Sequence, residues 1–211
     1  MIIVKLIGGL GNQLFQYSFG RFLSHKNNSS LKIDISAFYN YKLHNYSLNH
    51  FNIKESIISE RERKKFFFDS PTLNKIALKH IAPKFYRFSS KYIKAKDIYF
   101  HADYLDLRGD LYLDGYWQSE KYFIEIRDIL LNELTVNTPI TKSNSDYLDT
   151  IKATNSISLH IRRADFLYNL ETNSVHGVCD INYYNKAVKK IFENVIDPVF
   201  FVFTDDHEWV K

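Results

Sequence analysis

The residue types best suited to chemistry lie together in one short segment, Ser156–Asp165, which reads SISLHIRRAD. Apolar and polar residues alternate along it, and this pattern predicts a buried β-strand that delivers His160 and Arg162 from its carboxyl end. Open α/β sheets bind ligands outside the carboxyl ends of their strands, and a guanidinium group is always charged and can fork two donors onto a phosphate. The segment therefore predicts an anion site. The alternative is a strand whose cations pair with nearby carboxylates, such as Asp165.

A second segment with the chemistry of a phosphate site opens the chain. An apolar strand expected over Ile2–Ile7 runs into Gly8-Gly9-Leu10-Gly11-Asn12-Gln13, and a helix should follow. Glycines allow a ligand to approach the backbone closely, and a helix N-terminus favours negative charge. This order is typical of nucleotide-binding units, but Leu14 stands where the dinucleotide fingerprint requires its last glycine. Asn12 is expected to cap the helix as part of its role.

The remaining segments predict two α/β domains. Thr135–Ser145 is rich in Thr, Asn, Ser and Pro and is the best candidate for a linker, so we expect domains at residues 1–140 and 141–211. In the first domain, further strands and helices are expected at Ser30–Ile35, Pro71–His80, Asp97–Phe100, Asp110–Leu113 and Ser119–Leu134. In the second domain, they are expected at Asp146–Ala153, Asn182–Asn194 and Val199–Phe203, with a last helix from His207.

The strand, helix, strand order of the second domain predicts a parallel crossover. The carboxyl ends of its two strands then share one edge of the sheet. Asp205 and Asp206, which follow the last strand, should therefore lie near His160 and Arg162. Cys179 is expected to be a small buried apolar residue.

Aromatic and loop residues supply candidate sugar contacts. Tyr116 and Trp117 follow a glycine break and could pack on a pyranose ring, although a core position is the usual fate of a tryptophan. Ala37–Phe51 is polar, aromatic and irregular, and long loops of this kind in α/β proteins often carry function. The acceptor surface is expected there. Its histidines, His44 and His50, are expected to be solvated.

The composition limits the classes of function. The 211 residues include 28 Lys and Arg against 24 Asp and Glu, and the formal net charge of +4 suits an anionic small ligand but is too weak to indicate nucleic acid. The single cysteine excludes an internal disulfide and favours a reducing compartment. No apolar run has the length of a membrane span. We expect a cytoplasmic protein; the basic, aromatic segment Lys84–Lys96 is either a solvated face or a peripheral contact with the inner membrane.

Five motifs, in the same order along the chain, resemble the α-1,2-fucosyltransferases of glycosyltransferase family eleven. They are GGLGNQLFQYSFGR at 8–21, GYWQSEKYF at 115–123, HIRRAD at 160–165, HGVCDINYY at 176–184 and FFVFTDDHEW at 200–209. The resemblance implies a GT-B-like architecture of two Rossmann-like domains with parallel sheets, GDP-L-fucose as donor, an inverting mechanism and no required metal. Members of that family continue beyond the position of Lys211, so the second domain is expected to be incomplete.

The resemblance also implies roles for single residues. Arg162, Asp165 and Asn12 are the expected catalytic residues, with Asn12 reaching the donor from the facing domain. Together with the residues singled out above, the expected substrate-binding set is His160, Arg163, Gly9, Gly11, Gln13, Asp205, Asp206, Tyr116, Trp117 and His176. The expected reaction transfers L-fucose to the 2-hydroxyl of a galactose-terminated glycan.

Three other classes of function stay open on the sequence. A metal-dependent sugar transferase could use Asp205 and Asp206, but adjacent acids on an extended segment point to opposite faces and chelate one ion poorly. A non-catalytic module that binds a nucleotide or a glycan is the second class. A dinucleotide-dependent oxidoreductase is the third, and Leu14 argues against it.

Overall fold

The structure is a computed structural model that describes residues 1–54, 56–68, 92–163, 167, 173–174 and 177–211. The helix predicted at Pro71–His80 lies outside these residues. The chain divides into two compact units, Met1–Thr138 and Pro139–Lys211, here named unit 1 and unit 2. The division falls inside Thr135–Ser145, the segment expected to link two domains.

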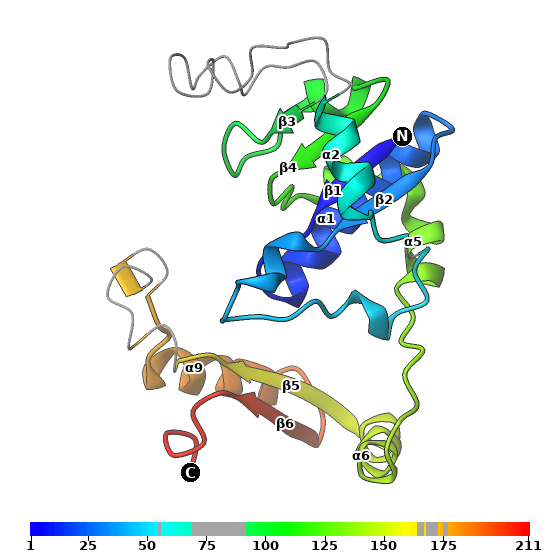
Figure 1. Ribbon diagram of the computed structural model, residues 1–211. Helices are drawn as coiled ribbons and strands as arrows, with labels where there is room; N and C mark the ends of the chain where they lie inside the picture. The colour runs from blue at the N-terminus through cyan, green and yellow to red at the C-terminus, as the bar shows by residue number, and fades with distance from the viewer. Residues whose placement is uncertain (55, 69–91, 164–166, 168–172, 175–176) are drawn as a thin grey trace. The chain divides into compact units, whose positions relative to one another are not determined.

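Unit 1 is built on a sheet of four parallel strands in the order β2-β1-β4-β3 (Figure 1). The strands are β1 (Ile2–Lys5), β2 (Leu31–Asp34), β3 (Tyr92–Lys94) and β4 (Leu111–Asp114). In the part of unit 1 that the structure describes, the α-helices are α1 (Leu10–Lys26), α2 (Glu60–Phe68) and α5 (Arg127–Glu133). Short 3-10 turns lie at Ser36–Tyr39, Leu48–His50, Ala102–Asp106, Glu120–Tyr122 and Ile124–Ile126. The predicted α/β class with parallel strands is confirmed.

One predicted strand of unit 1 is misplaced. The strand predicted at Asp97–Phe100 is absent, because residues 96–99 form bends, and the strand that pairs with β4 lies earlier, at Tyr92–Lys94. The side chain of Asp97 accepts hydrogen bonds from the backbone N–H of Tyr99 at 2.7 Å and lies 2.8 Å from His101 Nε2. Short polar side chains that bond to nearby backbone groups stabilise turns at the expense of strands.

The single helix predicted over Ser119–Leu134 is also wrong, because the segment breaks into two 3-10 turns followed by α5. Ser119 makes no side-chain cap. Tyr122, which is 2% exposed, lies with its ring centroid 4.9 Å from that of Phe19 and 4.8 Å from that of Phe100. Burial of this aromatic ring outweighs the continuity of the helix, because a buried aromatic side chain contributes far more than one helical turn.

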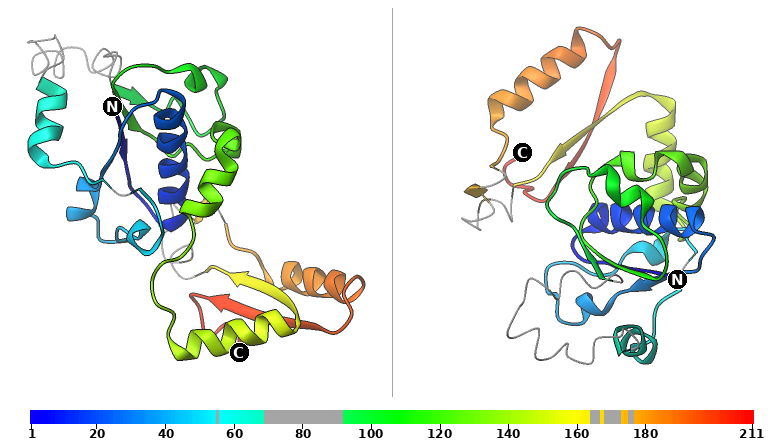
Figure 2. Two further views of the ribbon diagram at one scale, coloured as in Figure 1. Left: turned by 90° about the vertical axis from the view of Figure 1, so that its right-hand side faces the viewer. Right: turned by 90° about the horizontal axis from the view of Figure 1, so that it is seen from above.

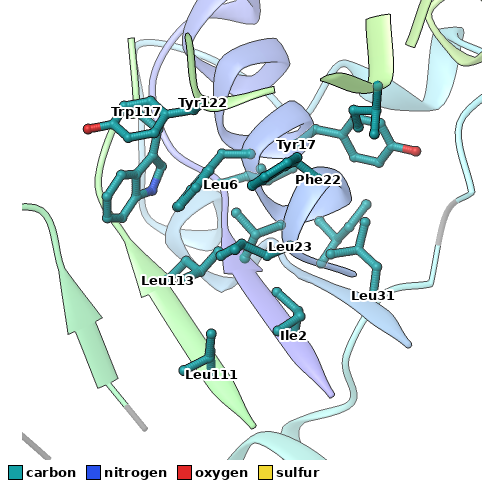
Figure 3. Packing of buried hydrophobic residues seen from close by; sticks show 14 of the residues in the cluster. Ile2, Leu6, Tyr17, Phe22, Leu23, Leu31, Leu111, Leu113, Trp117 and Tyr122 are labelled. Carbon is teal, nitrogen blue, oxygen red and sulfur yellow. The ribbon is translucent and has the colours of Figure 1, made fainter. Parts of the chain in front are cut away.

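The core of unit 1 lies between α1 and one face of the sheet (Figure 3). Ile2 and Leu113 of the strands meet Phe22 and Leu23 of α1 in this layer, and all of them are almost completely buried. The helix approaches β1 very closely, since a Cβ on Gly20 would lie 3.0 Å from the Cβ of Val4. A glycine is required at this contact for steric reasons.

A buried ionic cluster joins α1 to α5, which lies beside it (Figure 2). Arg21 Nε donates to both carboxylate oxygens of Glu133, at 3.0 and 3.1 Å, and Tyr17 Oη donates to the same carboxylate at 2.7 Å. Burial raises the pKa of Tyr17, and the hydrogen bond to Glu133 raises it further. The side chains of Arg21 and Glu133 are only 10% and 7% exposed, so each charge is stabilised in the interior by the other.

Replacing Glu133 by glutamine should destabilise unit 1 by about 3 kcal/mol, because it leaves the Arg21 charge buried without its partner. The chain has two tryptophans, Trp117 and Trp209, so urea unfolding followed by fluorescence in a Trp209→Phe background reports unit 1 alone. Glu125→Gln, at an exposed acid, is the matched control and should change stability by less than about 0.5 kcal/mol. Equal effects of the two variants would contradict the role of the cluster.

Unit 2 contains two parallel strands, β5 (Asn155–Ile161) and β6 (Pro198–Thr204), and two long helices, α6 (Lys142–Ala153) and α9 (Ile181–Phe192). The register runs from Asn155 opposite Pro198 to Ile161 opposite Thr204, so the predicted parallel pairing is confirmed and both carboxyl ends lie at one edge (Figure 1). Asp180 caps α9 by accepting a hydrogen bond from Tyr183 N at 2.8 Å.

Several local predictions for unit 2 are corrected. Helix α6 begins before the predicted Asp146, because Thr141 caps it through a 3.3 Å bond from Asn144 N. Residues 207–210 form turns, so the helix expected from His207 is absent. Cys179 is exposed, not buried. The strand β5, predicted to be buried, is largely half-buried or exposed up to its last residue, Ile161, which is 4% exposed.

In the part of the chain that the structure describes, no helix combines the length and the hydrophobicity that a membrane span requires.

Candidate functional site

The glycine turn of unit 1 has a backbone that only glycine fits well. Gly8 adopts φ +87°, and a Cβ placed on it would lie 2.5 Å from Asn12 Nδ2. Gly9 is extended and precedes α1, which has no side-chain cap and no acidic residue in its first turn. Uncapped backbone N–H groups at the start of a helix of 17 residues can bind an anion, and the helix dipole favours negative charge there.

Asn12 lies inside the first turn of α1 and does not cap it, which corrects the predicted capping role. Its Oδ1 accepts a 2.6 Å hydrogen bond from Gln118 Nε2. This contact ties the glycine turn to the loop that follows β4. Tyr116, two residues before Gln118, is 42% exposed, so its ring is available at this edge of the sheet.

Gln13 serves as an internal bridge. It is fully buried, and its Nε2 donates to the carbonyl oxygens of Gly8 and Asn45, each at 2.9 Å. Its Oε1 accepts from the backbone N–H of Ser47 at 3.0 Å. The side chain therefore fastens the loop Ala37–Phe51 to the glycine turn, and any effect of Gln13 on a ligand would be indirect.

His44 is a candidate that the sequence did not identify. Its ring lies against Gly9, since a Cβ placed on Gly9 would be 3.5 Å from His44 Cε1. The bridge through Gln13 explains this placement, because it holds the residue next to His44 onto the turn. A histidine in a loop carries no local pattern that would have marked it, apart from the functional role expected for the whole loop.

Trp117 takes the core position that was the alternative to a sugar contact. It is 4% exposed and packs edge-on against Tyr104, with ring centroids 4.9 Å apart. A Cβ on Gly115 would lie 2.5 Å from that of Ala95, so the glycine break serves close packing. Of the two aromatic residues predicted to contact a sugar, only Tyr116 is exposed.

The geometry predicts opposite effects of alanine at two neighbouring glycines. Gly8→Ala should lower the stability of unit 1 by about 2 kcal/mol, because of the positive φ and the contact with Asn12. Gly11→Ala should raise it by roughly 0.5–1 kcal/mol, because a Cβ there meets nothing within 4 Å and α1 is already helical at this position. Urea unfolding followed by Trp117 fluorescence measures both, and a shared sign would contradict the described turn.

In unit 2, Arg163 organises the carboxyl edge of the sheet. Its backbone N–H donates to Asp205 Oδ1 at 2.7 Å, and its Nε lies 3.4 Å from Asp206 Oδ2. The guanidinium carbon lies 4.1 Å from the ring centroid of Trp209, in a cation–π contact. The side chain is 14% exposed, so Arg163 is a structural residue of this edge as well as a candidate ligand.

The predicted neighbourhood of basic and acidic residues is present at this edge. The register places Ile161 opposite Thr204, so the segments that carry His160 and Arg162 on one strand and Asp205 and Asp206 on the other end side by side, and Arg163 contacts both acids. His160 and Arg162 are exposed at the end of β5. Asp165 and His176 lie outside the described residues. Burial raises the pKa of Tyr184, whose hydroxyl lies 3.5 Å from the carbonyl oxygen of His160.

Metal-binding groups are not assembled among the described residues. No three of their His, Cys, Asp and Glu side chains come together in a way that could hold a metal ion. The uncapped N–H groups at the start of α1 suit an anion, and the carboxyl ends of β5 and β6 form the edge at which α/β sheets usually bind ligands.

Arg163→Met should lower the free energy of opening the carboxyl edge of unit 2 by about 2 kcal/mol, because it removes the cation–π contact and the ion pair with Asp206. Amide hydrogen exchange of β5 and β6 should become faster. Lys186→Met, at an exposed lysine of α9, should leave these exchange rates unchanged. Unchanged exchange in the Arg163 variant would exclude the structural role.

The fold has a counterpart among solved structures. The crystal structure of NodZ alpha-1,6-fucosyltransferase soaked with GDP-fucose is similar with a TM-score of 0.51, at 14% sequence identity, over 98% of this chain and 71% of that chain. The fold is therefore of the GT-B type, as predicted.

Sequence comparison then identifies the family. A model described as Glycosyl transferase family 11 matches residues 1–211, and the chain belongs to this family. An alpha-1,2-colitosyltransferase of Escherichia coli is 35% identical over 214 residues, which cover all of this chain and 71% of the relative. The O-antigen biosynthesis glycosyltransferase WbnK of Escherichia coli is 29% identical over 231 residues, which cover 98% of this chain and 73% of the relative. The predicted family is confirmed.

Proposed function

We propose that this chain belongs to an inverting glycosyltransferase that moves L-fucose from GDP-L-fucose to the 2-hydroxyl of a galactoside, without a required metal. The observation that carries the proposal is the match to glycosyl transferase family 11 over residues 1–211, which spans both the glycine turn and the His160–Asp165 motif. The names of the relatives support it, since one acts as an alpha-1,2-colitosyltransferase and the structural neighbour was soaked with GDP-fucose.

The chemical demand of this reaction is charge stabilisation on the leaving group. As the bond between the sugar and the diphosphate breaks, the sugar carbon gains oxocarbenium character and negative charge grows on the β-phosphate. Preorganised positive groups are most effective where such charge develops. The exposed Arg162 at the end of β5 is the residue to which we assign this role in unit 2, with His160 as a second contact to the nucleotide.

Unit 1 supports the proposal through its own anion-binding geometry. The start of α1 presents backbone N–H groups without a side-chain cap, next to two glycines that let a ligand approach. Tyr116 is exposed beside this turn and could pack on the ring of an acceptor sugar. We assign Asn12, which is fixed in place by Gln118, to the orientation of the donor.

The test is a transfer assay with GDP-L-fucose and a β-galactoside, with the linkage of the product determined by NMR. Arg162→Ala should reduce the rate by about 10²–10³-fold, because one preorganised charge at a developing oxyanion has this effect. Arg61→Ala, at an exposed arginine of α2, should leave the rate unchanged. Full activity in excess EDTA is expected, and a requirement for added Mg²⁺ or Mn²⁺ would reject the metal-free mechanism.

Calorimetry with GDP separates catalysis from binding. GDP binding without turnover on any galactoside would favour the non-catalytic binding module. If GDP did not bind and no turnover occurred, the proposed donor would be overturned.

A second donor has specific support, because the relative with 35% identity is named for colitose transfer. GDP-colitose and GDP-L-fucose should therefore be compared in the same assay. A higher kcat/KM with GDP-colitose would identify colitose, in place of fucose, as the transferred sugar. The rest of the proposed mechanism would be unchanged.

A further inference from the structure

The imidazole ring of His44 lies across the glycine turn of unit 1. The Cβ that Gly9 lacks would be 3.5 Å from His44 Cε1, 3.6 Å from Nε2 and 3.8 Å from Nδ1, so the ring edge that carries both nitrogens faces Gly9. Because the glycine places no side chain there, an atom of a ligand beside Gly9 comes within reach of a ring nitrogen. A general base must lie within hydrogen-bond reach of the proton that it removes.

This ring is held in place and is still accessible. Gln13 bonds to the carbonyl oxygen of Asn45 and to the N–H of Ser47, and these bonds fix the main chain directly after His44. Tyr41 packs against the ring, with centroids 5.9 Å apart. His44 is half-buried, so part of its surface faces solvent. A substrate therefore meets a ring whose position is fixed before it binds.

The ring nitrogens of His44 are not engaged by the protein, since neither forms a hydrogen bond or an ion pair within the described ranges of the chain. The acids that end β2 and β4, at the carboxyl edge of the same sheet, are engaged. Asp34 accepts a hydrogen bond from Tyr112 Oη at 2.7 Å. Asp114 lies 3.2 Å from Lys5 Nζ. Of these side chains at the edge, the imidazole is the one with a lone pair to offer a substrate.

The surroundings of His44 suit a sugar hydroxyl. The loop that carries it also exposes Tyr39, which is 76% exposed, and Tyr116 is exposed beside the turn. Tyrosine offers an apolar ring and a polar hydroxyl, and a sugar likewise presents both apolar and polar surface. The anionic part of a ligand has its own partners in the uncapped N–H groups of α1, so the imidazole is left for an uncharged hydroxyl.

We propose that His44 is the general base of the transfer, an inference that rests on the proposed function. The acceptor oxygen bonds to C1 of the donor sugar as the bond from C1 to the diphosphate oxygen breaks. GDP leaves with that electron pair, and the hydroxyl proton moves to a ring nitrogen of His44. Imidazole groups change charge between about pH 5 and 8, so the neutral form is present to accept the proton.

Few other charges face this ring in the described contacts. The first turn of α1 holds no acidic residue. Tyr41 is the titratable side chain packed against the ring, and the neighbouring Lys42 is exposed. Phenol and ammonium groups ordinarily titrate near about pH 10. A loss of rate on the acidic side of neutrality therefore reports on a histidine, and variants identify which one.

Steady-state kinetics tests this role on the whole chain, with a β-galactoside and the GDP-sugar that gives the higher kcat/KM. His44→Gln should lower kcat by about 10²-fold, the usual contribution of a general base, and leave the Kd of GDP unchanged in calorimetry. In the unchanged protein, kcat should fall between about pH 8 and 5 as the imidazole takes up a proton. This fall should be absent in His44→Gln and should persist in His160→Gln, which alters the proposed nucleotide contact.

His50→Gln is the matched control. His50 is an exposed histidine of the same loop, and its Nδ1 lies 2.8 Å from Thr138 Oγ1. Both kcat and its pH dependence should stay unchanged in this variant.

Gly9→Ala tests the same point without altering the base. Gly9 has φ −68° and ψ 172°, which alanine adopts without strain, and the added methyl group would occupy the point beside the ring nitrogens. The KM of the galactoside should rise several-fold. Circular dichroism verifies that each variant is folded, and an unchanged KM in folded Gly9→Ala overturns the proposal.

The outcomes separate the base from the proposed function. No turnover in the unchanged protein overturns the proposed function, and the role of His44 with it. If the unchanged protein is active and folded His44→Gln has the same kcat, or keeps the acidic fall in rate, only the role of His44 is overturned. A loss of GDP affinity that accounts for the loss of rate would assign His44 to the diphosphate and would also overturn the base.

Discussion

Unit 1 depends on one steric constraint, the close approach of α1 to β1. The contact of Gly20 with Val4 sets the distance between helix and strand, and the chain must therefore turn sharply between them. Gly8 supplies that turn with a positive φ, and α1 starts directly after it without a side-chain cap. The same packing that fills the core thus leaves backbone donors exposed at the start of the helix, where an anion can bind.

In unit 2, two adjacent arginines have different surroundings. Arg163 is held by Asp205, Asp206 and Trp209, so it fixes the end of β5 relative to the end of β6. Arg162 is exposed at the same edge. The catalytic charge that we propose for Arg162 would be effective only if its position were fixed before the reaction, and the contacts of Arg163 fix the backbone beside it.

Sequence patterns predicted α1, α9 and every parallel strand except β3, because segments with a clear hydrophobic pattern carry a strong local signal. They failed at Asp97–Phe100, where a side chain stabilises a turn, and at Ser119–Leu134, where the burial of Tyr122 breaks the helix. The candidate site residues came from motifs that themselves carry charge or glycine. The contact of His44 with Gly9 and the bridge through Gln13 were not predicted, because both depend on contacts between distant parts of the chain.

The loop Ala37–Phe51 is attached to the glycine turn through its main chain. Gln13 bonds to the carbonyl of Asn45 and the N–H of Ser47, groups that every residue except proline provides. Side chains of this loop can therefore change during evolution while its anchor persists. If the loop contacts the acceptor as proposed, such an arrangement would let related enzymes diversify the glycans they recognise without rebuilding the turn that we propose to bind the nucleotide sugar.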